Sequence, residues 1–296
     1  MITKLENGRI YDPINKINGK IKDLFIKNGK IIDRPKRNEK ISKIINFKKK
    51  IIMAGGIDIH SHIAGGKVNL ARLLLPEEHR KYLYSSSNIL RSGSGLGTCS
   101  SFHIGYKYAK LGYTTVFEPA TLPSNARSAI IEMNDIPLID KGTYTVLSND
   151  DFLLKLIKKK SSQKKINDYV AWIIQSTKSL GIKIVNPGGI NAFKYNQREL
   201  DLDEKNKKYN ITPRSILKVL TKSLIDLKAP HPIHVHGCNL GVPGNVKTTL
   251  KQINAVEGKP MHLTHIQYHS YNNEGDKKFS SGASFLAEKI NKNKNI

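Results

Sequence analysis

Short runs of β-branched and apolar residues recur along the second half of the chain, separated by segments with helical periodicity. These runs predict strands at residues 113–117, 143–147, 182–185, 233–236 and 261–264. The segments between them predict helices, including one over 101–111 capped by Ser100 or Ser101, and one over 168–180 that ends at Gly181. Strands that alternate with helices indicate right-handed βαβ crossovers and a parallel barrel.

A further strand is predicted where the apolar run that starts at residue 51 breaks at two glycines and then alternates. Asp58, His60 and His62 share one face of this strand, because successive side chains point to opposite sides. Two histidines spaced by one residue can bring their imidazole nitrogens to one metal ion. For an isolated pair, a polar strand end with surface histidines is the alternative.

The first 50 residues form a separate unit in this interpretation. Two apolar runs, 24–27 and 30–32, flank Asn28-Gly29, which is the strongest short signal for a β-hairpin. We therefore predict an N-terminal β-sandwich segment over 1–50 and a (β/α) barrel over 51–296.

Lys183 lies between Ile182 and Ile184, on a strand that should be mostly buried. A buried ammonium group is costly unless it is paired. One interpretation is a structural lysine whose charged end reaches solvent. The other is that Lys183 reacts with carbon dioxide to form a carbamate, which replaces the cation with an oxygen ligand able to bridge two metals.

Histidines gather at the ends of two more predicted strands. His234 and His236 share one strand face, and His262, His265 and His269 cluster after the last strand. Any single histidine is usually a satisfied core or surface residue, but three separate clusters are hard to obtain by chance. We predict that two Zn²⁺ ions are held by five residues: His60, His62, Lys183, His236 and His262.

The remaining polar residues at these strand ends are assigned to the substrate and to the reaction. The predicted substrate-binding residues are Asn186, Asn239, His234 and His269. The predicted catalytic residues are Lys183, His236 and His265.

Several of these segments resemble a known family. The string Gly55-Gly56-Ile57-Asp58-Ile59-His60-Ser61-His62 is similar to the first-strand signature of the amidohydrolase superfamily, whose (β/α)8 barrels place the histidine pair at a metal centre. The chain also resembles the A subunits of formylmethanofuran dehydrogenases and of the formyltransferase/hydrolase complexes of methylotrophs. That resemblance is carried by residues 112–120, 182–189, 234–245 and 262–271.

The resemblance implies a dinuclear zinc hydrolase of one-carbon metabolism and methanogenesis, which interconverts an N-formylmethanofuran-type carrier with formate and the free amine. It implies that Lys183, at the position of the carboxylated lysine, bridges the metals and that Asp58 supports the histidine pair. The expected partners are the other subunits of such a complex and the methanofuran-type carrier. One partner subunit carries the redox or formyl-transfer step.

The pattern departs from the family in one respect. Only six strands are found, whereas a closed barrel needs eight, and the family takes its proton-shuttling aspartate from strand eight. We therefore expect an incomplete barrel without strands seven and eight, and either a fragment or a truncated gene product.

Composition changes this picture little. The 296 residues carry a net charge of +25, but the lysines are dispersed among Asn and Ile without a recurring aromatic-basic pattern. The glycine-rich segment 93–97 follows no predicted strand, which argues against a phosphate loop. Two cysteines, no apolar leader and no long apolar run predict a cytoplasmic protein that is not inserted in a membrane.

Three function classes remain open from sequence. The first is the dinuclear zinc hydrolase, and the second is a catalytically inactive structural subunit of the same complex. The third is a basic nucleic-acid-binding protein, although we expect no nucleic-acid partner. A dihydroorotase or hydantoinase is disfavoured by the strings Asn186-Pro187-Gly188-Gly189 and 240–245.

Overall fold

The computed structural model describes residues 1–75, 77, 100–197, 200–293 and 295–296. The chain divides into two compact units, Met1–Gly56 and Ile57–Ile296. The segment 93–97 and Cys99 lie outside the described residues. Among the described helices, none is long and apolar enough to cross a membrane.

The N-terminal unit is a five-stranded sheet in the order β3-β2-β1-β4, with β5 also paired to β1. Asn28 and Gly29 join β2 to β3 with φ angles of 51° and 73°, so the predicted hairpin is confirmed. The strands of this unit are β1 (Ile2–Asp12), β2 (Ile17–Lys27), β3 (Lys30–Ile32), β4 (Lys43–Asn46) and β5 (Ile51–Met53).

The position of β5 corrects one prediction. Residues 51–53 were expected to open the first barrel strand, but they pair in parallel with residues 9–11 of β1. The division between the two units accordingly falls after Gly56 rather than after residue 50. An apolar run marks a strand, but it carries no information on which of two sheets the strand joins.

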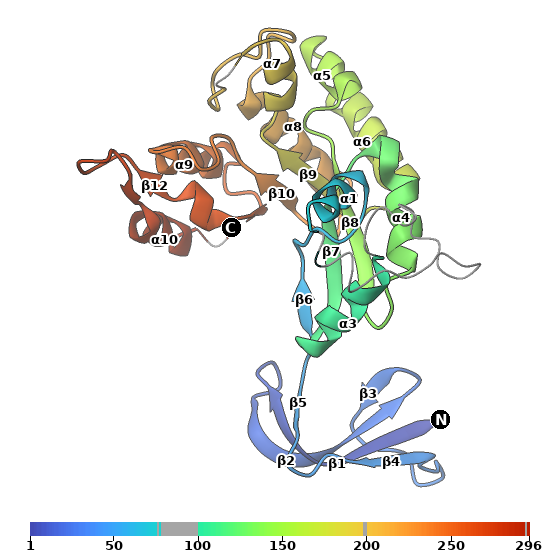
Figure 1. The fold of residues 1–296 in the computed structure, drawn as a ribbon. Helices are drawn as coiled ribbons and strands as arrows, with labels where there is room; N and C mark the ends of the chain where they lie inside the picture. Colours follow the sequence, from blue (N-terminus) through green and yellow to red (C-terminus); the bar gives the residue numbers. More distant parts are fainter. Residues whose placement is uncertain (76, 78–99, 198–199, 294) are drawn as a thin grey trace. The chain divides into compact units, whose positions relative to one another are not determined.

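The second unit contains a six-stranded sheet in the order β11-β10-β9-β8-β7-β6. Figure 1 labels the strands β6 to β10 of this sheet. The registers given for β7 through β11 are all parallel. This incomplete α/β barrel confirms the predicted fold class. Its strands are β6 (Gly56–Asp58), β7 (Tyr113–Thr121), β8 (Asp140–Val146), β9 (Gly181–Val185), β10 (Ile233–His236) and β11 (Met261–Leu263), and a separate hairpin is formed by β12 (Tyr271–Asn272) and β13 (Ser280–Ser281).

Helices connect these strands. They are α1 (Gly66–Leu73), α3 (Phe102–Lys110), α4 (Ala126–Asn134), α5 (Asp151–Lys158), α6 (Gln163–Thr177), α7 (Gly189–Lys194), α8 (Pro213–Asp226), α9 (Asn245–Ala255) and α10 (Ala283–Asn291), with short 3-10 turns η2 (Pro123–Asn125) and η3 (Ile266–His269).

Helix α6 differs from the predicted helix at both ends. It begins after Ser162, whose side chain accepts a hydrogen bond from the Lys165 amide, and it ends at Lys178, which adopts a left-handed conformation. Gly181 instead opens strand β9. The polar first turn hid the start of the helix, because it adds nothing to the apolar periodicity.

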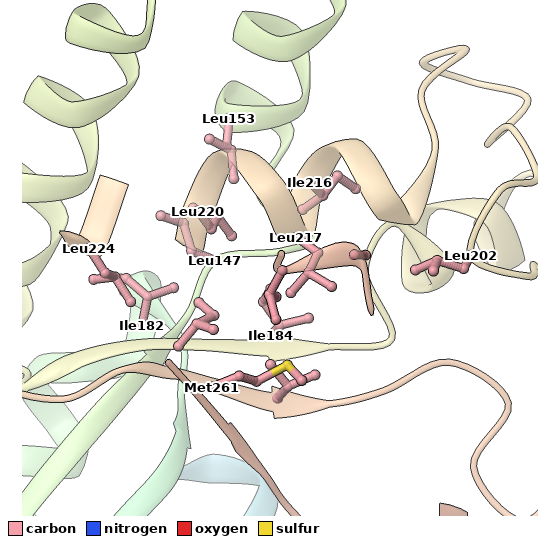
Figure 2. Packing of buried hydrophobic residues seen from close by; sticks show 14 of the residues in the cluster. Leu147, Leu153, Ile182, Ile184, Leu202, Ile216, Leu217, Leu220, Leu224 and Met261 are labelled. Atoms are coloured by element: carbon pink, nitrogen blue, oxygen red, sulfur yellow. The ribbon is translucent and has the colours of Figure 1, made fainter. Parts of the chain in front are cut away.

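One face of the sheet carries the main hydrophobic core. Figure 2 shows Ile216, Leu217, Leu220 and Leu224 of α8 above the strand that bears Ile182 and Ile184. Helices α5 and α6 pack beside α8 and extend the same core. Each buried aliphatic side chain of this kind contributes about 1.5–3 kcal/mol through removal of apolar surface from water.

Candidate functional site

The alternation of side chains along β9, β10 and β11 places a polar cluster on the sheet face opposite that core. Ile182, Val235 and Met261 belong to the core, whereas the residue that follows each of them is a lysine or a histidine. Lys183 pairs in register with His234, and His234 pairs with His262. The polar face of three neighbouring strands is therefore continuous.

His60 follows strand β6 and lies at the centre of this cluster. Its Nδ1 is 2.8 Å from Nε2 of His234, and its Nε2 is 3.5 Å from Nζ of Lys183. The ring of His265 lies edge-on to it, with the ring centroids 4.4 Å apart. The Asp58 carboxylate accepts a 3.0 Å hydrogen bond from the His60 amide, and so holds this part of the backbone.

His236 forms the second part of the cluster. Its Nδ1 is 3.0 Å from Nε2 of His265, and its ring centroid is 5.8 Å from that of His269. His269 is 1% exposed, and neither of its ring nitrogens has a hydrogen-bond partner among the described residues. A buried polar side chain without partners is costly.

His62 lies beside His60, with ring centroids 5.6 Å apart. Its Nδ1 is 3.1 Å from a carboxylate oxygen of Glu118, which is 1% exposed. Sequence reasoning gave Glu118 no role. The available signal was a carboxylate inside a mostly apolar strand, a residue type that is rarely buried without partners.

The structure separates His262 from the other predicted ligands. His262 stacks on His234 at 4.7 Å and lies 5.8 Å from the His231 ring centroid, and among the described residues no hydrogen bond or ring contact joins it to His60 or His236. His265 occupies the position beside His60 and His236 instead. Its left-handed backbone, at φ 44°, turns the chain two residues after the end of β11, and the strand pattern alone could not predict this.

Aromatic stacking fills the same sheet face near His234. Tyr144 of β8 stacks on His234 at 4.7 Å and on Phe117 of β7 at 5.4 Å. Gly142 leaves room for this layer, since a Cβ there would lie 2.3 Å from the Phe117 ring. Together with His262, this layer supports the polar cluster from one side.

Two predicted substrate-binding residues line one cavity next to His236. Asn186 directly follows β9 and Asn239 lies three residues after β10, and both have left-handed backbone conformations, with φ angles of 37° and 58°. The cavity has a volume of about 400 Å³ and also touches Gln197 and Glu204. A larger cavity of about 730 Å³ borders His62 and Glu118.

Burial controls the protonation of the cluster. It lowers the pKa of Lys183 to about 8, against the opposing effect of the nearby Glu118 carboxylate. Burial also lowers the pKa of His60 to about 2 and that of His236 to about 3, with further lowering from Lys183. The imidazoles are therefore neutral near pH 7, which is the form that binds metal ions.

The side chains of this cluster are of types that bind zinc, but they are not arranged around a common point. Neutral imidazoles and a lysine able to lose its proton are suitable ligands or ligand precursors. No group of three or more His, Cys, Asp or Glu side chains within the described ranges is arranged to hold a metal ion. The imidazoles bond to one another in pairs instead, as His60 does with His234 and His236 with His265.

Residues 43–295 match the amidohydrolase family, and the chain belongs to this family. Among curated proteins, it is 39% identical over 303 residues to protein FwdA of Methanocaldococcus jannaschii, covering 99% of this chain and 53% of that protein. It is 35% identical over 292 residues to the A subunit of the formyltransferase/hydrolase complex Fhc of Methylorubrum extorquens, covering 98% of this chain and 52% of that protein. The chain thus spans about half the length of these relatives.

Solved structures agree with this assignment. The crystal structure of the formyltransferase/hydrolase complex FhcABCD from Methylorubrum extorquens with methylofuran contains a chain that is 34% identical, with a TM-score of 0.89. The match covers 100% of this chain and 53% of that one. Phenylurea hydrolase B, at 11% identity and a TM-score of 0.55, shares the fold alone.

Proposed function

We propose that this chain carries the hydrolytic centre of a formyl-carrier amidohydrolase, which interconverts N-formylmethanofuran, or a related N-formyl carrier, with formate and the free amine. The observation that carries the proposal is the cluster of the buried Lys183 with the half-buried His60, His236 and His265 near the strand ends of an amidohydrolase sheet. The 39% identity to FwdA and the 35% identity to the Fhc relative favour formyl carriers over other amides.

We propose that two zinc ions belong to this centre. They would be held by His60, His62, Lys183 as its carbamate, and His236, with His265 better placed than His262 for the remaining position. When bound, such ions supply hydroxide near neutral pH and polarise a carbonyl oxygen.

Lys183 is suited to carbamate formation because its pKa is lowered to about 8 by burial, so the neutral amine is available near neutral pH. The amine nitrogen forms a bond to the carbon of CO2, one N–H proton is released, and a carbamate anion results. This change replaces an unfavourable buried cation with an anion facing neutral imidazoles.

The side chains around this cluster would position the carrier. Asn186 and Asn239 present amide groups to the cavity next to His236, where they can bond the formamide and the groups next to it. The His269 ring, which is unpartnered among the described residues, gives the same region a buried donor and acceptor. Together these residues would orient the formyl group and exclude water from it.

The proposed setting is a complex of several subunits. The chain in the FhcABCD structure that this protein resembles belongs to such an assembly, and a partner subunit would carry the redox or formyl-transfer step. One observation favours a second candidate function, that of a structural subunit. The histidines bond to one another in pairs and do not converge on a common point.

The deciding experiment combines metal content with hydrolysis. The purified chain is analysed for zinc by elemental analysis and assayed for formate release from N-formylmethanofuran. Lys183→Ala is compared with Lys165→Ala, a control that removes an exposed lysine from α6. We expect about two zinc ions per chain, lost in Lys183→Ala and retained in the control. A well-folded chain without stoichiometric zinc would favour the structural subunit.

A further inference from the structure

Glu118 binds the segment that follows His62 with both of its carboxylate oxygens. Oε1 accepts hydrogen bonds from Nδ1 of His62 at 3.1 Å and from the Ala120 amide at 2.9 Å. Oε2 accepts from the amides of Ile63 at 2.7 Å and Ala64 at 3.2 Å. Four donors occupy the roughly four acceptor positions of a carboxylate, so this group is held in a single orientation.

A second buried carboxylate holds the same segment without touching His62. Glu132 of α4 accepts hydrogen bonds from the Gly65 amide at 2.8 Å and from the Asn69 side chain at 3.1 Å. It also pairs with Arg72, which donates to the carbonyl of Ile63. The backbone after His62 is therefore fixed from two sides, and of the two carboxylates Glu118 is the one that reaches the imidazole itself.

We propose that Glu118 is a positioning residue that fixes the tautomer and the ring orientation of His62, an inference that rests on the proposed metal-dependent function. A carboxylate accepts hydrogen bonds and donates none, so Nδ1 of His62 must carry the proton. The lone pair then lies on Nε2, which has no hydrogen-bond partner among the described residues. Carboxylate partners of this kind orient ligating histidines and increase their basicity.

The neutral variant Glu118→Gln tests this role because it replaces one hydrogen-bond-accepting oxygen with an NH2 group, which is a donor. The amide oxygen of the new side chain satisfies the adjacent backbone donors Ile63 and Ala64. Its NH2 group then faces His62 and donates to Nδ1, which leaves the proton on Nε2, while the Ala120 amide loses its acceptor. The matched control is Glu132→Gln, which loosens the same backbone segment but leaves the Glu118–His62 bond in place.

The first measurement is the tautomer of His62 in the metal-free full chain, read from nitrogen chemical shifts in ¹⁵N-histidine NMR. It is made at about pH 8, above the ordinary histidine pKa, with His62→Gln used to assign the signal. We expect protonated Nδ1 in the wild type and in Glu132→Gln, and protonated Nε2 in Glu118→Gln. A wild type with protonated Nε2, or no change in Glu118→Gln, would overturn the inference.

The second measurement is Co²⁺ binding to the same three proteins by chelator competition and visible absorption. We expect the dissociation constant to rise about 10- to 100-fold in Glu118→Gln, and about threefold or less in Glu132→Gln. An equal loss in both variants would show that only the backbone segment matters, which contradicts the proposal. A wild type that binds no Co²⁺ but has the expected tautomer would defeat the metal-dependent function and leave the positioning of His62 standing.

Discussion

The two faces of strands β9, β10 and β11 contain neighbouring residues of the same short sequences, yet they have opposite properties. Ile182 and Val235 pack into a core of aliphatic side chains under α8, as Figure 2 shows for Ile182. Lys183 and His234, one position away, lie in a polar layer in which burial lowers the pKa of both side chains. One face stabilises the sheet, and the other holds groups that are costly to bury.

This difference predicts that substitutions on the two faces have different effects. Truncations on the core face should lower stability strongly, because they remove buried apolar surface and leave a cavity. Substitutions of ionisable groups on the polar face should remove groups proposed for metal binding or catalysis. They should leave the free energy of unfolding unchanged or increased near pH 7, because the penalty for burying the ionisable group disappears with it.

The largest effect is expected for Leu220→Ala on the core face. Leu220 is fully buried in α8 against the sheet, so the variant should lose about 2–5 kcal/mol of unfolding free energy. Urea denaturation followed by circular dichroism measures this loss. Leu111→Ala, which truncates a leucine that is 73% exposed, should change it by less than about 0.5 kcal/mol. Equal losses in the two variants would refute the contrast between core and surface.

Lys183→Met tests the polar face through pH. The pKa of Lys183 falls from 10.5 in the unfolded chain to about 8 in the folded one, so the unfolded state binds more protons between these values. Wild-type stability should therefore rise with pH from about 8 to 10.5, by on the order of 3 kcal/mol, and reach its full value above the unfolded pKa.

The methionine variant lacks this titration and should be the more stable protein near pH 7. The difference between the two proteins, measured by urea denaturation in CO2-free buffers, should shrink as the pH rises. A constant difference across this range would show that Lys183 is charged in the folded protein, paired with Glu118 more strongly than burial opposes it.

Acid should destabilise the same polar face. The pKa of His236 is lowered to about 3 by burial, whereas the unfolded residue titrates near 6.5. The stability that His236 contributes is present above pH 6.5 and is lost as the pH falls toward 3, at about 2 kcal/mol by pH 5. His236→Gln should show a shallower loss than the wild type between about pH 6.5 and 4. Parallel pH profiles for the two proteins would contradict the buried neutral imidazole.

Much of this contrast could be predicted from the sequence. The alternation in residues 182–185 and 233–236 gave both strands and the face of each side chain, because side-chain direction follows from strand geometry. The expected six strands and the N-terminal hairpin were also confirmed. These features depend on local pattern, which a single sequence contains.

Features set by tertiary contacts could not be predicted in this way. The choice between His262 and His265 depends on a left-handed turn after β11, and the assignment of residues 51–53 depends on which sheet they join. Glu118 was missed because three of its four partners are backbone amides, which have no sequence signature. The metal-ligand roles and the carrier stay predictions.

The smallest expected effect is in the N-terminal sheet. The described residues of this sheet include no cluster of buried ionisable groups like that of Lys183 and the histidines. Gly29 has a φ of 73°, and a Cβ there would meet no atom within 4 Å, so Gly29→Ala adds backbone strain without a clash. We expect a loss of about 1 kcal/mol, seen as faster amide hydrogen exchange in β2 and β3. Gly66→Ala adds the same methyl group without a clash at a position without positive φ and should cost less than about 0.5 kcal/mol. If exchange in β9 and β10 accelerates equally in Gly29→Ala, the two sheets unfold together, and the contrast between regions applies to chemistry but not to stability.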